Sequence, residues 1–422
     1  MAHRPEVLDA VHRARAASRT LRVASGDKRN AFLKHLGEAL MKDRAVLLTA
    51  NQEDVRAAEA AGVSKAMLDR LALNEKRIDD LVANAREVQA LPDPVGAVSS
   101  TKVLASGLRV ERRRVPLGVL LLIYEARPNA TIEAAALAVK SGNAIVLRGG
   151  SEAAKTNRAL SGVLQKALAA ADLPADAATV LTDLSRDETI ALLALSDDID
   201  LAIPRGGPAL IDTVKQNARM PVLAHGPGIC HVFVDAGAEL EQAADVAVNA
   251  KANRPATCNA AETLLVHSAT AAAFLPMFGK RYMETGGELR ACDESAAHFK
   301  KAGIAYKNAT PEDYATEHLA NILNVRIVGS LDDALAHIER YGTRHTEAIL
   351  TSSIKNAERF CRDVDASCVL VNASTRLNDG FCLGYGAELG ISTSKFHAFG
   401  PMGLEALTIE KNVAVGDGQT RR

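Results

Sequence analysis

The sequence predicts an α/β protein in which parallel strands alternate with crossover helices. Short apolar runs such as GVLLLIY, AIVLRGG, CHVFVD and SCVLVN are separated by helix-like patterns such as TIEAAALAVKSG and AELEQAADVAVNAKA. This alternation is typical of parallel sheets that are covered by helices. The chain has 422 residues, of which 48% are hydrophobic, so its length favours two or three domains over one.

The first hundred residues lack such strands and are predicted to form amphipathic helices. Phe32, Leu33, Leu36 and Leu40 recur at the spacing that places side chains on one helix face, with alanines and charged residues between them. The alternation of strands and helices begins at about residue 108. We therefore expect a helical N-terminal segment that precedes the sheet.

Charge and composition exclude several classes of partner. The formal net charge is -1 without long runs of one sign, which argues against nucleic acid and anionic membranes and favours a small-molecule substrate. The N-terminus lacks an apolar leader, and no segment is long and apolar enough to span a bilayer, so we expect a cytoplasmic protein. The six cysteines are too scattered to predict a disulfide framework or a cysteine-based zinc site.

An arginine-rich segment, SGLRVERRRVPLG, is too polar for a buried strand. It carries Arg112, Arg113 and Arg114 in an alternating pattern that follows a glycine. One interpretation is a hairpin arm that pairs with another subunit. An ordinary surface hairpin explains the pattern equally well.

The stretch AIVLRGGSEAAKTN joins a strand directly to a helix. Gly149, Gly150 and Ser151 open that helix, whose free backbone amides attract anionic ligands. Arg148 ends the strand and adds a guanidinium that suits a ribose 2′-phosphate better than a hydroxyl group. The stretch therefore favours NADP over NAD as a cofactor.

The same construction recurs in LAIPRGGPALIDTVKQNA. Here Arg205, Gly206 and Gly207 follow a strand and precede a helix, so two such turns could hold opposite ends of one dinucleotide. In each loop, glycine could instead serve only to make a tight turn. The sequence contains no GxGxxG fingerprint, which leaves the standard dinucleotide motif without support.

Cys258 lies in NRPATCNAAETLLVH, between a helix-like and a strand-like run. Pro255 and small neighbours such as Ala256 and Ala260 would leave its sulfur accessible. A single cysteine is more often a small buried apolar residue, and composition alone does not decide between these interpretations.

The order of VLRGGSE, IPRGG, ATC and TEHLANIL along the chain resembles the aldehyde dehydrogenase superfamily. Residues 328–349, VGSLDDALAHIERYGTRHTEAI, resemble the signature of the branch that reduces γ-glutamyl phosphate in proline biosynthesis. IYEARPNATIEAAALAVKSGNA is also similar to this branch, and the resemblance spans essentially the whole chain. It implies two Rossmann-like α/β domains and an oligomerisation arm.

The resemblance also implies where the domains begin and end. The NADP-binding domain would comprise residues 1–224, with a returning segment at about 378–400 and an oligomerisation hairpin at about 107–118. Residues 225–377 would form the catalytic domain that carries Cys258. Residues 401–415 would form a C-terminal oligomerisation strand.

In this family Cys258 would attack the acyl carbon of L-glutamyl 5-phosphate, and NADPH would reduce the resulting thioester to L-glutamate 5-semialdehyde. Glu317 matches the glutamate that contacts the cofactor ribose, although Leu319 and Ala320 replace the phenylalanine and glycine that usually follow. His225 stands where hydrolytic members have a glutamate that activates water. Losing that base is consistent with an acyl-phosphate reaction, which must keep water away from the thioester.

Other residue roles follow less directly. Asn129 and backbone amides near Cys258 are candidates for stabilising the oxyanion, although ARPNAT differs from the usual motif. Arg127, Arg254 and Arg376 are candidates for binding the anionic groups of the substrate, although an arginine in such a position is more often a solvated or structural residue.

His337 and His345 are eight residues apart, which is not a recognised metal-ligand spacing, and the chemistry needs no metal. Either histidine could orient its loop or contact phosphate.

A homodimer or a dimer of dimers is expected, and contact with glutamate 5-kinase is a hypothesis that the lability of the acyl phosphate motivates. Two rival functions remain. The same fold could use coenzyme A or water as acyl acceptor, against which the 328–349 signature and the missing glutamate argue. A catalytically silent nucleotide-binding protein would lack a use for Cys258 and Arg148.

Overall fold

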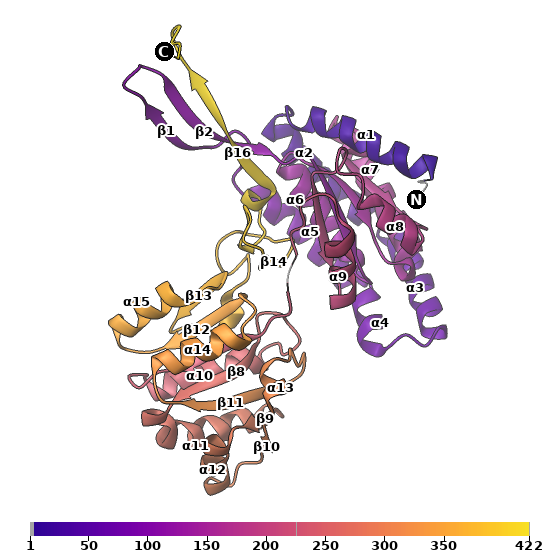
Figure 1. Cartoon of the computed structure of the whole chain (residues 1–422). Helices are drawn as coiled ribbons and strands as arrows, with labels where there is room; N and C mark the ends of the chain where they lie inside the picture. The colour runs from indigo at the N-terminus through magenta and orange to yellow at the C-terminus, as the bar shows by residue number, and fades with distance from the viewer. Residues whose placement is uncertain (1–3, 225, 422) are drawn as a thin grey trace. The chain divides into compact units, whose positions relative to one another are not determined.

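The computed structural model describes residues 4–224 and 226–421, and it divides into two compact units (Figure 1). Unit 1 comprises residues 1–224, 384–390 and 396–422, and unit 2 comprises residues 225–383 and 391–395. Within the described part of the chain, no helix is long and apolar enough to cross a membrane.

Unit 1 begins with five helices, as the N-terminal pattern predicts. They are α1 (Pro5–Leu21), α2 (Gly26–Lys42), α3 (Arg44–Ala60), α4 (Lys65–Leu71) and α5 (Glu75–Ala90). The Ser25 hydroxyl caps α2 by accepting a hydrogen bond from Lys28 N at 3.3 Å. The apolar face of α2, including Phe32 and Leu36, is fully buried, and α2 packs against α5 and α7 (Ala154–Ala170).

The sheet of unit 1 has four parallel strands in the order β5-β4-β3-β6. Its elements are β3 (Val119–Tyr124), α6 (Pro128–Lys140), β4 (Ala144–Arg148), η1 (Ser151–Ala153), η2 (Ala175–Ala177), β5 (Ala178–Leu181), α8 (Arg186–Leu192), β6 (Leu201–Arg205) and α9 (Pro208–Asn217). Every residue of β3 is buried, because neighbouring strands and helices cover it. Pro204 lies in β6, an outer strand, where its missing N–H costs little.

The chain leaves β3 toward β4 and β5 on one side and places β6 on the other side. This arrangement makes the gap between the carboxyl ends of β3 and β6 a topological switch point, where open α/β sheets bind ligands.

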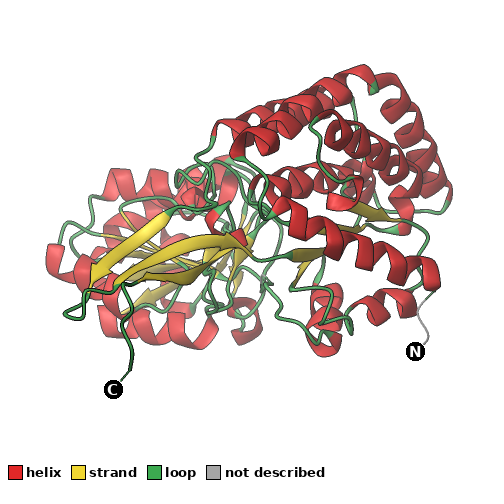
Figure 2. Ribbon diagram, turned by 90° about the horizontal axis from the view of Figure 1, so that it is seen from above, coloured by secondary structure: helices red, strands yellow, loops and turns green. Residues whose placement is uncertain are grey.

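Three antiparallel strands form an arm of unit 1. They are β1 (Val98–Val103), β2 (Arg109–Pro116) and β16 (Thr408–Val415), with β2 in the centre (Figure 1). Figure 2 shows the strands of the chain in yellow, seen from above. The arginine run forms ion pairs: Arg112 of β2 lies 2.8 Å from Glu410 of β16, and Arg114 lies 2.9 Å from Glu405, just before β16.

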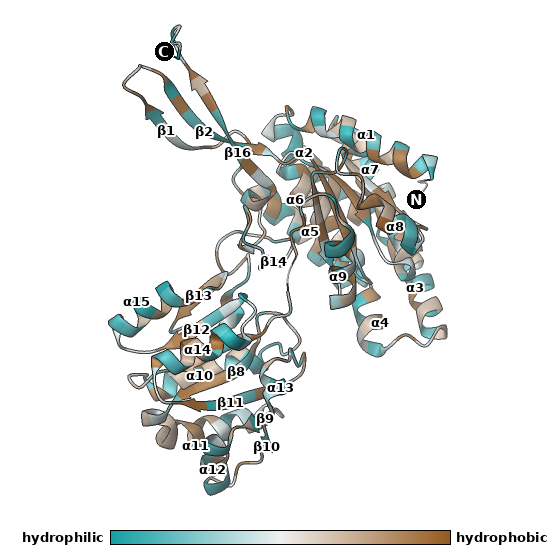
Figure 3. Cartoon of the chain, in the orientation of Figure 1, coloured by the Kyte–Doolittle hydropathy of each residue, from teal (hydrophilic) through white to brown (hydrophobic). Residues whose placement is uncertain are grey.

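The hairpin expected at about 107–118 begins earlier in the chain, and residues 107–118 contain only its second strand. The turn lies at residues 104–108, where Leu104 N donates to Leu108 O at 2.9 Å and Gly107 has a φ of +82°. The first strand, VSSTKV, has too little apolar alternation to be recognised from its sequence. Hydrophilic and hydrophobic residues alternate along the arm in Figure 3, as is typical of a sheet with little hydrophobic core of its own.

Unit 2 contains a fully parallel sheet of seven strands in the order β10-β9-β11-β8-β7-β12-β13. Its elements are β7 (Cys230–Val234), α10 (Leu240–Ala252), β8 (Ala261–His267), α11 (Ser268–Glu284), β9 (Glu288–Ala291), α12 (Asp293–Lys301), β10 (Lys307–Asn308), α13 (Pro311–Tyr314), β11 (Ile322–Val328), α14 (Leu331–Tyr341), β12 (Thr346–Leu350), α15 (Ile354–Asp363), β13 (Cys368–Val371) and η3 (Thr375–Leu377).

Alternate residues of these strands enter two different cores. Val232 and Val234 of β7 pack with residues of α10, α11 and α12, whereas Phe233 between them packs with residues of α14 and α15. The same alternation holds for Leu264 and Leu265 of β8. Both faces are therefore covered, which explains the continuous apolar runs in the sequence and confirms the predicted α/β class.

The chain crosses between the units again near its C-terminus. Residues 384–390 and 396–422 belong to unit 1, and residues 391–395 belong to unit 2, so the returning segment is split where the sequence predicts one piece at about 378–400. The remaining short elements are β14 (Ile391–Ser392), β15 (Gly400–Pro401) and η4 (Glu405–Leu407).

Candidate functional site

A cavity of about 360 Å³ lies at the carboxyl ends of the unit 1 strands. Arg148 of β4 and Arg186 of α8 line it together with Ser151 and two carboxylates, Glu125 and Glu152. Burial lowers the pKa of the Arg148 guanidinium, while the nearby Glu152 raises it, and an arginine remains protonated under such opposing effects. The volume of the cavity lies within the range of small-molecule sites, roughly 300–1,000 Å³.

The turn after β4 requires glycine at position 149. A Cβ there would lie 2.3 Å from the Asn157 amide nitrogen and 2.9 Å from the Tyr124 hydroxyl. Those two side chains form a buried network with Thr131, in which the Tyr124 and Thr131 hydroxyls are 2.5 Å apart. Arg148, Gly150 and Ser151 are thereby presented to the cavity on a rigid support.

The second glycine turn is arranged differently. Arg205, Gly206 and Gly207 are not among the residues that line the cavity. Arg205 Nη1 donates to the carbonyl of Leu389, in the returning segment of the same unit. Gly207 N donates to a carboxylate oxygen of Glu125 at 2.9 Å. The start of α9 therefore has an internal anion, which sequence patterns did not indicate.

Asn129 and Arg127 lie at the start of α6, also in unit 1. Arg127 is the exposed N-cap residue, and Asn129 Nδ2 donates to Glu133 at 2.9 Å. Ala126, before them, has a positive φ of 29°, and its N–H donates to Glu152 at 2.7 Å. A positive φ at alanine is strained, and the Glu152 carboxylate stabilises this conformation.

Cys258 lies in unit 2, in a tight turn between α10 and β8. Ala260 N donates to Thr257 O at 3.0 Å and closes the turn around the cysteine. The Thr257 hydroxyl donates to Arg254 O at 2.8 Å, which fixes the preceding residues. Cys258 is partly exposed, whereas Asn259 beside it is buried, so the turn presents the sulfur and anchors its neighbour.

Two of the predicted arginines lie near Cys258. Arg376 Nη1 donates to the Asn259 side chain, and its Nε donates to Asn253 at 3.4 Å, so this guanidinium spans the turn. Burial and the positive charge of Arg254 lower the pKa of Arg376, while Asp379 and Cys258 raise it. Two neighbouring guanidinium groups repel one another, and an anion bound between them relieves that repulsion. The arrangement suits an anionic substrate.

A chain of buried polar groups from neighbouring segments of unit 2 supports the turn that carries Cys258. The Cys230 thiol donates to Cys258 O at 3.2 Å and lies 3.7 Å from His345 Nδ1. His345 Nδ1 is 2.7 Å from the Thr346 hydroxyl. Asn378 Nδ2 also reaches that hydroxyl, at 2.8 Å, and Asn378 O accepts from Asn259 Nδ2 at 2.9 Å, which closes a ring. His345 and Thr346 belong to the 328–349 signature, so the signature supports the cysteine turn.

Glu317 approaches the same turn from the other side. Its Oε1 accepts a hydrogen bond from Gly228 N at 3.0 Å. A Cβ on Gly228 would lie 1.7 Å from Cys258 O, so only glycine permits this approach of two backbones. Burial raises the pKa of Glu317, and the Gly228 amide and Lys251 oppose the shift.

The other histidines are placed differently. His337 packs in the core of unit 2 against His231, Tyr314 and Tyr341. Burial, together with positively charged neighbours, lowers its pKa to about 2, so it stays neutral. His225 lies outside the described residues. His337 thus has a packing role, unlike His345.

Sequence patterns missed the residues that hold Cys258 in place. Cys230 and Gly228 gave no local signal, because a single cysteine or glycine is usually explained by packing or by a turn. Lys251 and Glu262, which form a fully buried ion pair on either side of the turn, read as ordinary charged residues. A charged residue within an otherwise apolar strand, AETLLVH, was the one available hint.

Comparisons with known proteins show the family and the fold of this chain. A model of the aldehyde dehydrogenase family matches residues 1–288. The chain is 52% identical over 405 residues to a γ-glutamyl phosphate reductase from Anaeromyxobacter sp. (strain Fw109-5), covering 96% of this chain and 95% of the relative.

A γ-glutamyl phosphate reductase from Meiothermus ruber is 50% identical over 417 residues, which is 99% of each chain. Among solved structures, a γ-glutamyl phosphate reductase from Thermotoga maritima superimposes with a TM-score of 0.96 at 42% identity, covering 99% of this chain and all of the other.

Proposed function

The chain belongs to the γ-glutamyl phosphate reductases, a branch of the aldehyde dehydrogenase family, and we propose that it reduces L-glutamyl 5-phosphate with NADPH through a thioester on Cys258. The products are L-glutamate 5-semialdehyde and phosphate, in the second step of proline biosynthesis from glutamate. The observation that carries this proposal is the partly exposed Cys258, held in a closed turn beside Arg254 and Arg376.

In the proposed mechanism the Cys258 thiolate attacks the acyl carbon of the substrate. A carbon–sulfur bond forms, the carbon–oxygen bond to phosphate breaks, and inorganic phosphate leaves with the bonding electron pair. NADPH, when bound, supplies the hydride that reduces the acyl group. The oxyanion of the resulting thiohemiacetal then expels the Cys258 thiolate and becomes the aldehyde oxygen.

Arg254 and Arg376 bind the anionic groups of the substrate and stabilise the thiolate. Backbone amides of the turn stabilise the oxyanion. Asn129 stays a prediction for the same role; in this structure its amide donates to Glu133 in unit 1. Arg127 stays a prediction for substrate binding.

Cofactor binding is assigned to the unit 1 cavity. Arg148, Gly150 and Ser151 line it, and the Arg148 guanidinium suits a 2′-phosphate, which favours NADP. Arg205, Gly206 and Gly207 stay a prediction for cofactor binding; Arg205 contacts Leu389 of the returning segment and Gly207 contacts Glu125. Glu317 remains a proposed ribose contact in unit 2.

The experiment is the reverse reaction: NADP reduction by glutamate 5-semialdehyde, with and without inorganic phosphate. We expect turnover that depends strictly on phosphate and is lost in Cys258→Ala. Turnover without phosphate would mean that water or another acceptor takes the acyl group. Activity that survives in Cys258→Ala would place the nucleophile elsewhere.

We also propose that the arm joins copies of this chain. Exposed apolar residues on it support this proposal: Val98, Val103, Leu104, Ile409 and Val415. Removing residues 408–422 should convert an oligomer to monomers in sedimentation experiments, and a monomeric full-length chain would contradict it.

We also propose that this chain contacts glutamate 5-kinase. The test is to mix the two proteins, and an unchanged elution volume in gel filtration together with an unchanged rate would refute the contact.

A further inference from the structure

A buried ion pair closes the segment that carries Cys258. Lys251 lies near the end of α10 and Glu262 lies near the start of β8, and Lys251 Nζ is 2.7 Å from Glu262 Oε2. Both side chains are almost fully buried, at 0% and 1% exposure. The pair therefore ties the two ends of residues 252–261 together beneath the turn.

Burying both charges is costly unless further polar groups satisfy them. The backbone of His318 faces the Glu262 carboxylate and favours its charged form. The other oxygen, Oε1, has no hydrogen-bond partner within the described part of the chain. Because hydrophobic residues often replace such a pair without loss of stability, a need for stability alone does not explain these charges.

The His318 contact links the pair to a second loop. Residues 315–321 carry Glu317, whose carboxylate accepts from Gly228 N at 3.0 Å next to Cys258 O. The Lys251 charge also acts on Glu317. The Lys251 ammonium group therefore pairs with Glu262 of β8 and also acts electrostatically on Glu317 of the second loop.

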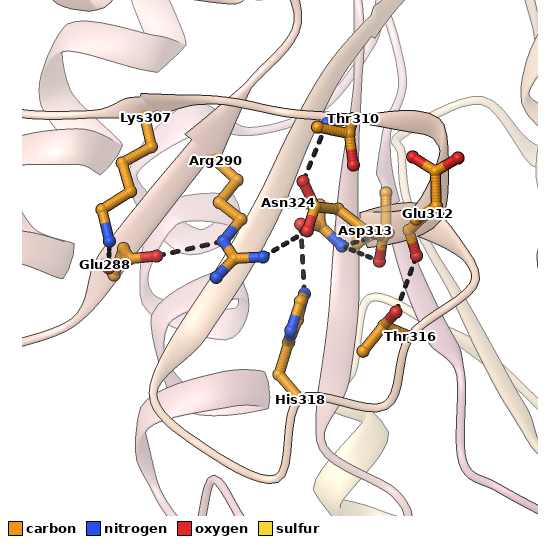
Figure 4. Close-up of polar contacts among 10 residues, drawn as sticks. Glu288, Arg290, Lys307, Thr310, Glu312, Asp313, Thr316, His318 and Asn324 are labelled. Carbon is orange, nitrogen blue, oxygen red and sulfur yellow. Dashed lines mark hydrogen bonds and ion pairs between the residues drawn. The ribbon is translucent and has the colours of Figure 1, made fainter.

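The outer side of this second loop is fixed by the network in Figure 4. His318 Nε2 is 3.3 Å from Asn324 Oδ1, and Asn324 Nδ2 donates to Asp313 O at 2.9 Å (Figure 4). Asp313 accepts from Thr310 N at 2.7 Å and pairs with Arg290 of β9. The loop is held between this network and Glu262.

We propose that Lys251 and Glu262 are positioning residues that set the geometry between the Cys258 turn and the Glu317 loop for the reductive reaction. This inference rests on the proposed function. Neither residue touches the substrate; each acts through the loop that it holds. Displacing reacting groups by about 1 Å can reduce a rate by roughly a hundredfold, so loosening this link should affect turnover more than binding.

The test is a double-mutant cycle with Lys251→Met, Glu262→Met and the double variant. Each single variant leaves one buried polar group without its partner and should lose both stability and activity. The double variant should recover a melting temperature close to that of the natural protein, while kcat for the reverse reaction stays about tenfold or more lower and KM for the semialdehyde changes by less than about threefold. Recovery of kcat together with stability would overturn the proposal.

Two further variants keep the test decisive. Glu262→Gln retains the shape of the side chain and an oxygen that accepts from Lys251, although it removes the negative charge. It should therefore keep more of the rate than Glu262→Met, even if the double variant does not fold; a rate as low as that expected for the double variant would count against positioning. Arg281→Met, in α11, removes surface ion pairs with Glu241 and Asp245 of α10, the helix that carries Lys251, and should change neither quantity.

Failure of this inference is distinguishable from failure of the proposed function. An active Cys258→Ala protein would refute the function whatever the pair does. A dead Cys258→Ala protein together with a fully active double variant would refute only the inference.

Discussion

The two units place their candidate functional groups at opposite edges of parallel sheets. In unit 1, Arg148 follows β4 and lines a cavity at the carboxyl ends of the strands. In unit 2, Cys258 precedes β8, Gly228 precedes β7 and Glu317 precedes β11, so the cysteine site lies at the amino ends. The first edge offers charged side chains to a ligand, whereas the second is fixed by backbone contacts and buried polar groups.

This difference shows how the two sites tolerate change. A side chain that reads a ligand can be replaced with loss of binding only. A turn held by backbone contacts cannot shift without displacing the nucleophile, so small steric changes there should have large effects on rate.

The largest effect is expected from Gly228→Ala. Its Cβ would meet Cys258 O at 1.7 Å, and one of the two backbones must move, which we expect to lower kcat at least about a hundredfold. Gly226→Ala is the matched control, because its Cβ would lie at an ordinary 3.4 Å from the Thr393 hydroxyl. Steady-state rates of both variants decide the matter, and a Gly228→Ala rate above half that of the natural protein would break the comparison.

Arg148→Met should raise KM for NADPH by about 30-fold and leave kcat nearly unchanged, since a charged hydrogen bond to phosphate contributes about 2 kcal/mol. KM for NADH should change little, because NADH lacks the 2′-phosphate. Parallel titrations with both cofactors measure this. An equal loss with both would mean that Arg148 supports the fold of the cavity and does not read the phosphate.

Arg376→Met should raise KM for the semialdehyde about tenfold and also lower kcat, because Arg376 both faces an anion site and holds Asn259. Arg254→Met should raise KM to a similar extent with a smaller loss of kcat, because Arg254 helps to stabilise the thiolate but does not hold Asn259. Arg362→Met, which removes only an exposed contact with Asp363, serves as control. If Arg254→Met and Arg376→Met change kcat equally, the bridging role of Arg376 is wrong.

The smallest effect concerns pH and stability. Burial raises the pKa of Glu262 to about 7 from its usual 4.5, with Lys251 opposing the shift. The folded state therefore binds this proton more tightly, and its contribution to the free energy of unfolding falls as pH rises through that window. Glu262→Gln lacks this dependence. As pH rises from 5 to 8, the free energy of unfolding of the natural protein should therefore fall relative to that of the variant in urea unfolding. A relative rise would contradict the direction of the shift.

Much of the fold could be predicted because local patterns determine it. The continuous apolar runs of β3, β7 and β8 follow from burial on both faces, and α2 follows from its helical periodicity. The short strands β5, β9 and β10 were missed, because segments of two to four residues acquire strand structure only from their neighbours in the sheet.

The candidate sites divide in the same way. Arg148 and its glycine turn were visible, since a strand, a turn and a helix start follow one another in sequence. The support of Cys258 was not, because Cys230 and His345 are distant in sequence and meet only through the order of β7 and β12 in the sheet. Glu125, which occupies the start of α9, was missed for the same reason.

The most direct test of the central claim is to trap the covalent intermediate. Mixing the protein with glutamate 5-semialdehyde and NADP in the absence of phosphate should transfer a γ-glutamyl group to Cys258, which mass spectrometry of the digested protein would detect on the peptide that contains this residue. Adding phosphate should remove the group and restore the unmodified mass. NADP reduction with an unmodified Cys258 peptide under the same conditions would contradict the account.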